Sequence, residues 1–293
     1  MSQSAIGLCG LGAYAPARVM TNDEWSQYVE TTDAWITERT GIKRRHLAAP
    51  EETTVDLAAH AATAALADAG LAPADIDELV VTSDTPEVYT PDTASFLQVR
   101  LGLRNVPAYD LAGSGCAGFI LGLDVARARV RDDPSRRILV VGVELISRLM
   151  DWSDRNICVL FGDGAGAAVI AQAEGVAEIL AATAGTDGRK SDILKLEVGG
   201  TRSPVNAERV ARRLHQHLEM NGREVFKEAV AHMSAATREV LDKAGLTLDD
   251  VALLVPHQAN LRILEAVRTE LGLPEDRVVI NVQEYGNTGS ASV

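Results

Sequence analysis

The sequence predicts an α/β protein built from two related halves. Short apolar segments typical of buried strands alternate along the chain with amphipathic segments that end at glycine. Such alternation is typical of a sheet covered by layers of helices. In addition, a segment of the first half recurs in the second half, so the same structural unit is expected twice.

Seven segments are predicted to be strands, because each is short, apolar and bounded by turn residues. They are residues 6–14, 77–84, 106–111, 136–145, 164–171, 252–257 and 277–282. Five segments with helical spacing of apolar residues are predicted to be helices. They are residues 54–70, 95–102, 118–130, 225–245 and 260–272. The glycines of GDGAG, residues 162–166, resemble a dinucleotide-binding turn, but a strand follows them, so we predict a tight turn near Cys116 instead.

The repeat aligns LADAGLAPADIDELVVTSDT, from residue 66, with LDKAGLTLDDVALLVPHQAN, from residue 241. Downstream, LGL at 101–103 matches LGL at 271–273 after a short gap. Repeats of this kind fold as similar units. We therefore predict an N-terminal half over 1–172 and a C-terminal half over 173–293.

The same register brings three polar side chains together. Cys116 lies in the turn before the helix 118–130 and falls opposite Asn287, while His257 directly follows ALLVP at the end of the predicted strand 252–257. Ligands of α/β folds gather at strand ends and turns. We expect Cys116, His257 and Asn287 to converge between the two halves.

Composition excludes several classes of protein. The chain has 293 residues, 28 Lys+Arg against 41 Asp+Glu, and a net charge of -13, which argues against a general nucleic-acid or membrane-surface binder. It contains no apolar run of roughly 20 residues and no signal-peptide pattern at its start. Its three cysteines lack metal-binding spacing, so no metal site is expected, and free thiols favour a reducing compartment. We predict a cytoplasmic protein.

The three converging residues suit thioester chemistry. A helix N-terminus or a histidine lowers the pKa of a thiol because each stabilises the thiolate, and we expect this for Cys116. Backbone amides around the sulfur would hold the oxyanion formed when it attacks a carbonyl. His257 and Asn287 would donate further hydrogen bonds to an enolate. The set favours carbon–carbon bond formation, and Cys9 and Cys158, in apolar strands, are interpreted as core residues.

Six segments resemble those of the β-ketoacyl-[acyl carrier protein] synthase III family, which belongs to the thiolase-like superfamily. They are TTDAWITERTGIKRRH, DLAGSGCAGF, VLFGDGAGAAV, NGREVFK, VPHQANLRI and YGNTGSASV. The resemblance implies a thiolase-like fold, with two duplicated halves in α-β-α-β-α layers. It also implies Cys116 as the acylated nucleophile, with His257 and Asn287 promoting decarboxylation of the malonyl group.

The resemblance further implies the binding sites. Trp35 and Arg39 fall where an indole and a guanidinium enclose the adenine of CoA, and Arg155 falls where a further arginine contributes to that site. The positions that match the pantetheine channel are Phe226, Asn260 and Arg262. The expected carrier-protein contacts are Lys227, Arg262 and Arg268. Some relatives carry a lysine pair where this chain has Thr269 and Glu270, so this surface is expected to differ.

In the acyl pocket, Thr90 stands where several relatives have phenylalanine, and we expect primers longer than acetyl unless Tyr89 refills the space. The implied partners are acyl-CoA, malonyl-[acyl carrier protein] and a second copy of the chain, with no cofactor. Family members continue beyond the segment that ends at Val293 with strands and a glycine-rich loop that supplies an oxyanion donor. The sequence is thus expected to be an incomplete representation of the functional protein.

Three functions stay open at this point. The first is the initiating condensation of fatty acid biosynthesis, in which an acyl-CoA primer and malonyl-[acyl carrier protein] give 3-oxoacyl-[acyl carrier protein]. The second is a related condensing enzyme of secondary metabolism that uses the same three residues. The third is a non-catalytic or redox-sensing protein in which Cys116 is oxidised.

Overall fold

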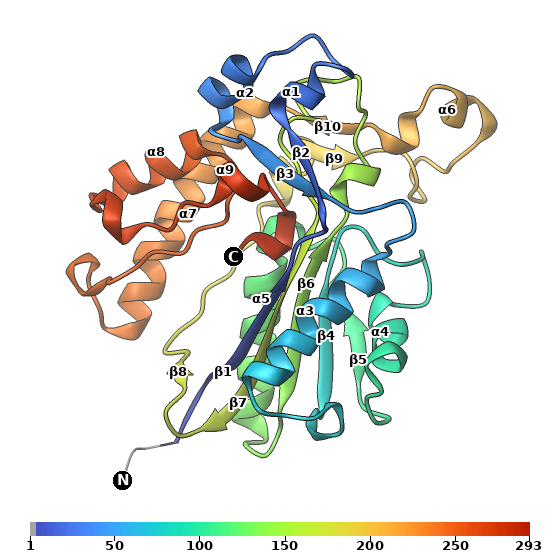
Figure 1. Cartoon of the computed structure of the whole chain (residues 1–293). Helices are drawn as coiled ribbons and strands as arrows, with labels where there is room; N and C mark the ends of the chain where they lie inside the picture. The colour runs from blue at the N-terminus through green and yellow to red at the C-terminus, as the bar shows by residue number, and fades with distance from the viewer. Residues whose placement is uncertain (1–3) are drawn as a thin grey trace.

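The computed structural model describes residues 4–293, and a six-stranded mixed sheet lies at its centre (Figure 1). The strand order is β5-β4-β6-β7-β1-β8; β4 is parallel to β5 and β6, and the other neighbours are antiparallel. The strands of this sheet are β1 (Ala5–Tyr14), β4 (Glu78–Thr82), β5 (Ala108–Asp110), β6 (Ile138–Glu144), β7 (Gly164–Ala173) and β8 (Ala177–Glu178). Five of the predicted strands are confirmed.

Helices cover both faces of this sheet because side chains alternate along its buried strands. Leu79, Val81 and Val141 pack with α3 (Thr54–Asp68) and α4 (Thr93–Leu101) in one apolar cluster. Their neighbours Val80 and Val140 pack with α5 (Gly118–Asp132) in another. Figure 1 shows α3 and α5 on opposite sides of the sheet. The first half is therefore a layered α-β-α unit.

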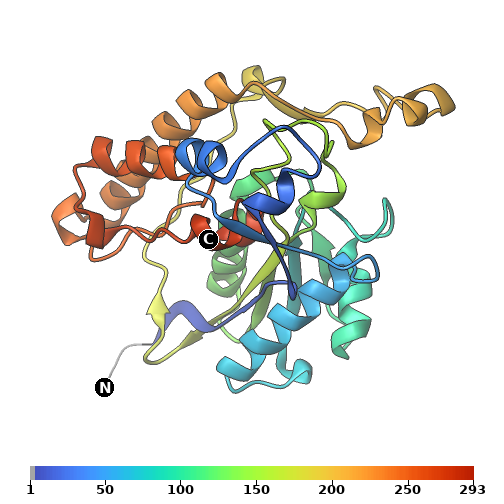
Figure 2. The ribbon, with the colours of Figure 1, turned by 45° about the horizontal axis from the view of Figure 1, so that its top comes forward.

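The second half contributes a helical pair beside this unit. The two helices are α7 (Gly222–Ala244) and α8 (Leu261–Leu271), and both confirm predicted helices. Buried Ile263, Val267 and Leu271 of α8 pack against one side of α7. Figure 2 shows this pair running along one side of the molecule.

The remaining elements lie around the sheet and the helical pair. They are β2 (Arg18–Thr21), α1 (Asn22–Trp25), α2 (Asp33–Thr40), β3 (Arg44–Leu47), β9 (Leu194–Leu196), α6 (Ala207–Ala211), β10 (Leu218–Met220) and α9 (Val282–Tyr285). The segment that carries α6 projects away from the body of the molecule (Figure 2). Across the described part of the chain, no helix has the length and apolarity needed to cross a membrane.

The start of the sequence repeat, where a helix ends, has the same backbone structure in both copies. Helix α3 ends before Gly70, with φ of 65°, and Leu71 N–H donates to the carbonyl of Leu66 at 2.9 Å. Helix α7 ends before Gly245, with φ of 69°, and Leu246 N–H donates to Leu241 at 2.9 Å. Both are glycine caps in the left-handed conformation, which glycine adopts without a Cβ clash. The duplication is thus visible in the geometry. The division of the chain at 172/173 stays a prediction.

Two predicted strands, 252–257 and 277–282, do not form. The two segments contact each other through one parallel bridge, between Leu254 and Val278. In the first copy of the repeat, the corresponding residues are Leu79 and Ala108, which pair where β4 meets β5. A buried strand needs ladder partners and covered faces, and among residues 4–293 no further strand pairs with this segment. Val255 accordingly stays 47% exposed.

Candidate active site

The backbone of Asn287 is hydrogen-bonded to the neighbouring segment that contains Leu160 and Gly162. Its N–H donates to the carbonyl of Leu160 at 2.9 Å, and its carbonyl accepts from Gly162 N–H at 2.9 Å. A Cβ on Gly162 would lie 2.3 Å from the carbonyl oxygen of Tyr285, so glycine is required for this approach. The tight turn predicted for GDGAG is not found, because Gly162 and Asp163 lead without a turn into β7 (Gly164–Ala173). Gly162 instead holds the Asn287 segment.

The side-chain amide of Asn287 has a defined orientation. Its Oδ1 accepts a hydrogen bond from Gly289 N–H at 2.9 Å, and the side chain is only 7% exposed. With Oδ1 engaged by this donor, the Nδ2 amide is the end left to act on a ligand. Asn287 therefore offers hydrogen-bond donors.

His257 follows the Leu254 bridge and is held by the turn Gly289–Ser292. Its Nδ1 lies 2.5 Å from Oγ of Ser292, and the same Oγ accepts from Gln258 N–H at 3.2 Å. Because Ser292 Oγ already accepts one proton, its own hydroxyl proton is available for Nδ1. Burial lowers the pKa of His257 to about 4, so the ring is neutral. A neutral ring that accepts at Nδ1 carries its proton on Nε2.

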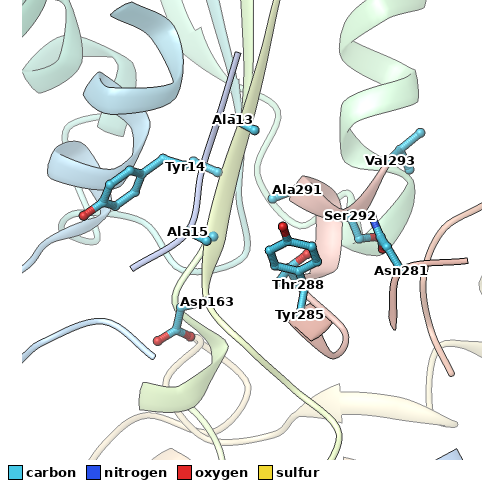
Figure 3. Close-up of a pocket in the computed structure, with 12 residues that line it drawn as sticks. Ala13, Tyr14, Ala15, Asp163, Asn281, Tyr285, Thr288, Ala291, Ser292 and Val293 are labelled. Atoms are coloured by element: carbon cyan, nitrogen blue, oxygen red, sulfur yellow. The ribbon is translucent and has the colours of Figure 1, made fainter. Parts of the chain in front are cut away.

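Figure 3 shows the turn that fixes Ser292. Thr288, Ala291 and Ser292 lie on one side of a cavity. Ala13, in β1, and Ala15, just after β1, lie on the other side. This cavity is separate from the one that contains Cys116, since their linings share no residue. The turn thus lies between two cavities, and the His257 that it holds lines the one that contains Cys116.

Cys116 lies in a 3-10 turn, Gly115–Ala117, directly before α5. Gly113 and Gly115 both have positive φ, 68° and 61°, and the N–H of Gly115 donates to Asp84 Oδ1 at 3.3 Å. The Gly/Ser/Ala composition thereby allows the turn to present the cysteine at the helix start. This part of the prediction is confirmed.

The predicted decrease in the pKa of Cys116 is wrong. Burial raises the pKa of the thiol to about 12, and the nearby carboxyl groups of Glu144 and Asp84 raise it further. Glu144 itself is 1% exposed, and burial followed by the charge of Asp84 raises its pKa to about 8. Desolvation penalises the thiolate more than the helix start stabilises it. The resting cysteine is a neutral thiol, and His257, in the same cavity lining, is a neutral imidazole.

One cavity of about 550 Å³ brings the three residues together. Cys116, His257 and Asn287 all contribute to its lining. Apolar side chains extend it outwards, and half-buried Asn260 and exposed Arg262 and Arg39 contribute polar groups. Its size and mixed lining are typical of a small-molecule site. The predicted convergence is found.

Comparison with known proteins places the chain in a family. The model of 3-oxoacyl-[acyl-carrier-protein] synthase III matches residues 109–188, and the model of its C-terminal part matches 241–293. The β-ketoacyl-[acyl-carrier-protein] synthase III of Caldanaerobacter subterraneus subsp. tengcongensis is 47% identical over 99% of this chain and 87% of its own length. The chain belongs to the β-ketoacyl-[acyl-carrier-protein] synthase III family. It is therefore an acyltransferase, as predicted.

Solved structures of synthase III proteins share the fold. The enzyme from Thermus thermophilus is 44% identical, with a TM-score of 0.89 over 98% of this chain and 87% of that chain. The enzyme from Aquifex aeolicus is 39% identical, with a TM-score of 0.89 over 98% of this chain and 88% of that chain. The thiolase-like α/β fold predicted for this synthase III is confirmed.

In this synthase III, the residues predicted to bind adenine lie together. The guanidinium carbons of Arg39 and Arg155 are 4.4 Å and 4.9 Å from the centre of the Trp35 ring. All three line a hollow that shares Arg39, Leu160, Met220 and Gly222 with the cavity of Cys116. Arginine stacks favourably on an indole face. The Trp35 hollow is therefore adjacent to the cavity of Cys116.

The residues predicted for the pantetheine channel line one cavity, while their role in binding stays a prediction. Phe226 and Asn260 line the Cys116 cavity. Asn260 caps the N-terminus of α8, with its Oδ1 accepting from Ile263 N–H at 3.0 Å, so its amide nitrogen is the free end. The amide can donate to a polar ligand in the channel.

Other predicted residues are distributed over the surface. Lys227 and Arg262 are exposed, whereas Arg268 forms a salt bridge with Glu265 at 2.8 Å and donates to the carbonyl of Leu273. Thr90 and Tyr89 lie in an exposed loop and do not line the cavity of Cys116 in the same chain. Tyr89 is 83% exposed.

Sequence reasoning missed three residues of the site: Ser292, Glu144 and Arg223. Ser292 holds His257, Glu144 lies near Cys116, and Arg223 lines the cavity. Ser292 lies in the motif YGNTGSASV and Arg223 in NGREVFK, so both were part of recognised motifs. The motifs alone did not show which residues these two side chains contact. Glu144 ends a strand that is buried throughout. An acidic residue at the end of such an apolar run is unusual, and this could have identified Glu144 from the sequence as a candidate site residue.

Proposed function

We propose that this synthase III condenses an acyl-CoA primer with malonyl-[acyl carrier protein], giving 3-oxoacyl-[acyl carrier protein] in the first condensation of fatty acid biosynthesis. The observation that carries the proposal is the shared cavity of one thiol, Cys116, and two hydrogen-bond donors, His257 Nε2 and Asn287 Nδ2. No cofactor takes part in the proposed chemistry, and a cytoplasmic location remains a prediction.

In the first half-reaction, Cys116 takes the acyl group. Its sulfur attacks the carbonyl carbon of acyl-CoA, the bond between that carbon and the CoA sulfur breaks, and the thiol proton ends on CoA. The product is an acyl-cysteine thioester. Because burial raises the pKa of the free thiol, the resting thiol is protonated, and we propose that it loses its proton as the sulfur attacks.

In the second half-reaction, the malonyl thioester loses CO₂. The electron pair of the broken carbon–carbon bond moves into an enolate, whose oxygen accepts hydrogen bonds from His257 and Asn287. The enolate carbon then attacks the acyl carbon on Cys116, and the carbon–sulfur bond to the enzyme breaks. The sulfur takes up one proton from solvent, and the 3-oxoacyl product leaves on the carrier.

Substrate binding is assigned to the residues around the cavity. We propose Trp35, Arg39 and Arg155 for the adenine of CoA, because the two guanidinium groups and the indole already stack. Phe226 and Asn260 line the path of the pantetheine arm. For carrier docking we propose the exposed Lys227 and Arg262, with Arg268 less available because Glu265 pairs with it.

A homodimer is part of the proposal. Strand β5 lies at the edge of the sheet, and exposed apolar side chains occur near it, including Val99 at 80% and Tyr89 at 83%. Exposed edges and apolar patches on one face favour association with a second copy. Thr90 and Tyr89 would then border the acyl pocket of the partner.

The catalytic proposal is tested by two product analyses. The purified protein is incubated with acetyl-CoA labelled in the acetyl group, and the Cys116 peptide is examined by mass spectrometry. An acetylated Cys116 supports the enzyme and excludes a purely redox role. Malonyl-[acyl carrier protein] is then added; acetoacetyl-[acyl carrier protein] supports the initiating condensation, whereas acetyl-enzyme without this product would favour a condensing enzyme of secondary metabolism.

Primer range and dimerisation have their own tests. With Thr90 beside the pocket, butyryl-CoA and isobutyryl-CoA should acylate Cys116, and Thr90→Phe should reduce this more than acetylation. If only acetyl-CoA reacts and Thr90→Phe has no effect, the pocket assignment is wrong. Sedimentation at micromolar concentration should give a dimer mass; a monomer would refute the partner contribution.

A further inference from the structure

Glu144 is a buried acid that lies next to both turns of the active site. It is the last residue of β6, it is 1% exposed, and it does not line the cavity of Cys116. Because β6 and β4 are parallel neighbours, their carboxyl ends lie at the same edge of the sheet. At this edge Glu144 meets the segment that follows β4 on one side and the turn Gly289–Ser292 on the other.

On the first side, Glu144 supports the cysteine turn, Gly115–Ala117. Both of its carboxyl oxygens accept from Asp84 N–H at 3.2 Å. Asp84 in turn accepts, at Oδ1, from the N–H of Gly115 at 3.3 Å, and Gly115 directly precedes Cys116. One residue, Asp84, thus connects the acid to the backbone of the nucleophile.

On the second side, Glu144 contacts the serine turn, Gly289–Ser292, which orients Asn287 and His257 through its first and last residues. Oε1 of Glu144 lies 3.0 Å from Oγ of Ser290 in this turn. A Cβ on Gly289 would lie 2.7 Å from Cγ of Glu144, so the acid and the turn are in close contact. The same carboxyl group therefore holds both turns.

The hydrogen bonds of Ser290 indicate that Glu144 carries a proton. Ser290 Oγ lies 3.0 Å from Glu144 Oε1 and 3.2 Å from the carbonyl oxygen of Thr82, but a hydroxyl group has only one proton to donate. Both contacts are satisfied when Glu144 donates to Ser290 and Ser290 donates to Thr82.

The charges around Glu144 agree with a neutral acid. Among residues 4–293, neither Glu144 nor Asp84 has an ion pair, and of two neighbouring buried acids one retains its proton. Burial, followed by the charge of Asp84, raises the pKa of Glu144 to about 8. Asp84 accepts from glycine N–H groups, which stabilise its ionised form.

We propose that Glu144, as the neutral acid, is a positioning residue that fixes the cysteine turn relative to the serine turn. The inference rests on the proposed function, in which an enolate held by His257 and Asn287 attacks the acyl carbon on Cys116. Acyl transfer needs the cysteine turn and decarboxylation needs the serine turn, but formation of the carbon–carbon bond needs the two in register. A misplacement of about 1 Å can cost about 10²-fold in rate. Loss of Glu144 should therefore uncouple decarboxylation from condensation.

The test compares the two products that acetylated enzyme can form from malonyl-[acyl carrier protein]. After loss of CO₂, an enolate that attacks the acetyl group gives acetoacetyl-[acyl carrier protein], and one that takes up a proton from solvent gives acetyl-[acyl carrier protein]. For Glu144→Ala we expect the ratio of the first product to the second, measured by mass spectrometry of the carrier, to fall about 10²-fold. Acetylation of Cys116 and release of ¹⁴CO₂ should each fall by no more than about ten-fold.

Two further variants test the protonation state and the link to the serine turn. Glu144→Gln has the donor and acceptor pattern of the neutral acid, so the product ratio should stay within about three-fold of wild type. Ser290→Ala removes one link and leaves the acid in place, and it should lower the ratio about ten-fold even if Glu144→Ala does not fold. Glu78→Gln is the control, because Glu78 is a buried acid at the other end of β4, paired with Arg136 at 2.8 Å, and it should leave the ratio unchanged.

Each other result overturns the inference. An unchanged product ratio in Ser290→Ala would show that the acid does not position the serine turn. Parallel loss of acetylation, decarboxylation and condensation, with an unchanged ratio, would show a merely structural role. If Glu144→Gln is as uncoupled as Ser290→Ala, the carboxylate rather than the neutral acid holds the turns. A wild-type protein that forms no acetyl-enzyme and releases no CO₂ would refute the proposed function itself.

Discussion

Ser292→Ala should separate the orientation of His257 from the reactivity of Cys116. The hydroxyl group of Ser292 donates to His257 Nδ1 and accepts from Gln258 N–H. Its removal frees Nδ1 to take up the ring proton, so that Nε2 no longer always carries one. One hydrogen bond contributes about 0.5–1.5 kcal/mol, and about 1.36 kcal/mol corresponds to ten-fold in rate. Decarboxylation should therefore fall by about 2- to 12-fold.

The assay measures the two half-reactions separately. Release of ¹⁴CO₂ from malonyl-[acyl carrier protein] reports decarboxylation, and mass spectrometry of the acetylated enzyme reports transfer to Cys116, which should stay within about two-fold of wild type. Ser292→Thr keeps the hydroxyl group and should restore decarboxylation, and Ser153→Ala, at an exposed serine, is the control. Normal decarboxylation by folded Ser292→Ala, or an equal loss of both half-reactions, would refute the reasoning.

Two further predictions concern protonation and packing. Because burial lowers the pKa of His257 to about 4, the ring stays neutral above that value. Decarboxylation by Cys116→Ala should therefore be constant between about pH 5.5 and 7, below the pKa of about 8 of the nearby Glu144; an inflection near the ordinary histidine value of about 6.5 would contradict this. Gly41→Ala should lower the free energy of unfolding by about 2–5 kcal/mol, since φ is 74° and a Cβ would lie 2.4 Å from that of Leu261. In urea denaturation, the control Gly70→Ala, with open space at φ of 65°, should lose only about 1–2 kcal/mol, and equal losses would exclude the clash.

Patterns of neighbouring residues predicted most strands and helices of the N-terminal half. The strands that become β4, β6 and β7 are apolar and buried on both faces, so their sequences alone distinguish them from turns. Glycines such as Gly70 and Gly245 marked helix ends correctly because only local backbone conformation is involved. The repeat then supplied a long-range relation, the approach of Cys116 to Asn287, that no local pattern contains.

The predictions that were wrong concern features that depend on contacts between residues far apart in the sequence. Residues 252–257 have a strand-like pattern, but a strand forms only with neighbours on its ladder, and here one bridge at Leu254 is what remains. The pKa of Cys116 was misjudged because burial and the charges of Glu144 and Asp84 come from distant segments. The role of Ser292 likewise depends on a contact 35 residues away along the chain.

The most direct test of the account is the division of labour among Cys116, His257 and Asn287. Cys116→Ala should form no acyl-enzyme but still release ¹⁴CO₂ slowly from malonyl-[acyl carrier protein]. His257→Ala and Asn287→Ala should each lose about 10²–10³-fold in decarboxylation, as expected for removal of one donor to a developing oxyanion, while Asn287→Ala keeps most of its transfer to Cys116. If folded Cys116→Ala loses both activities, or Asn287→Ala decarboxylates at the wild-type rate, the assignment of these roles is wrong.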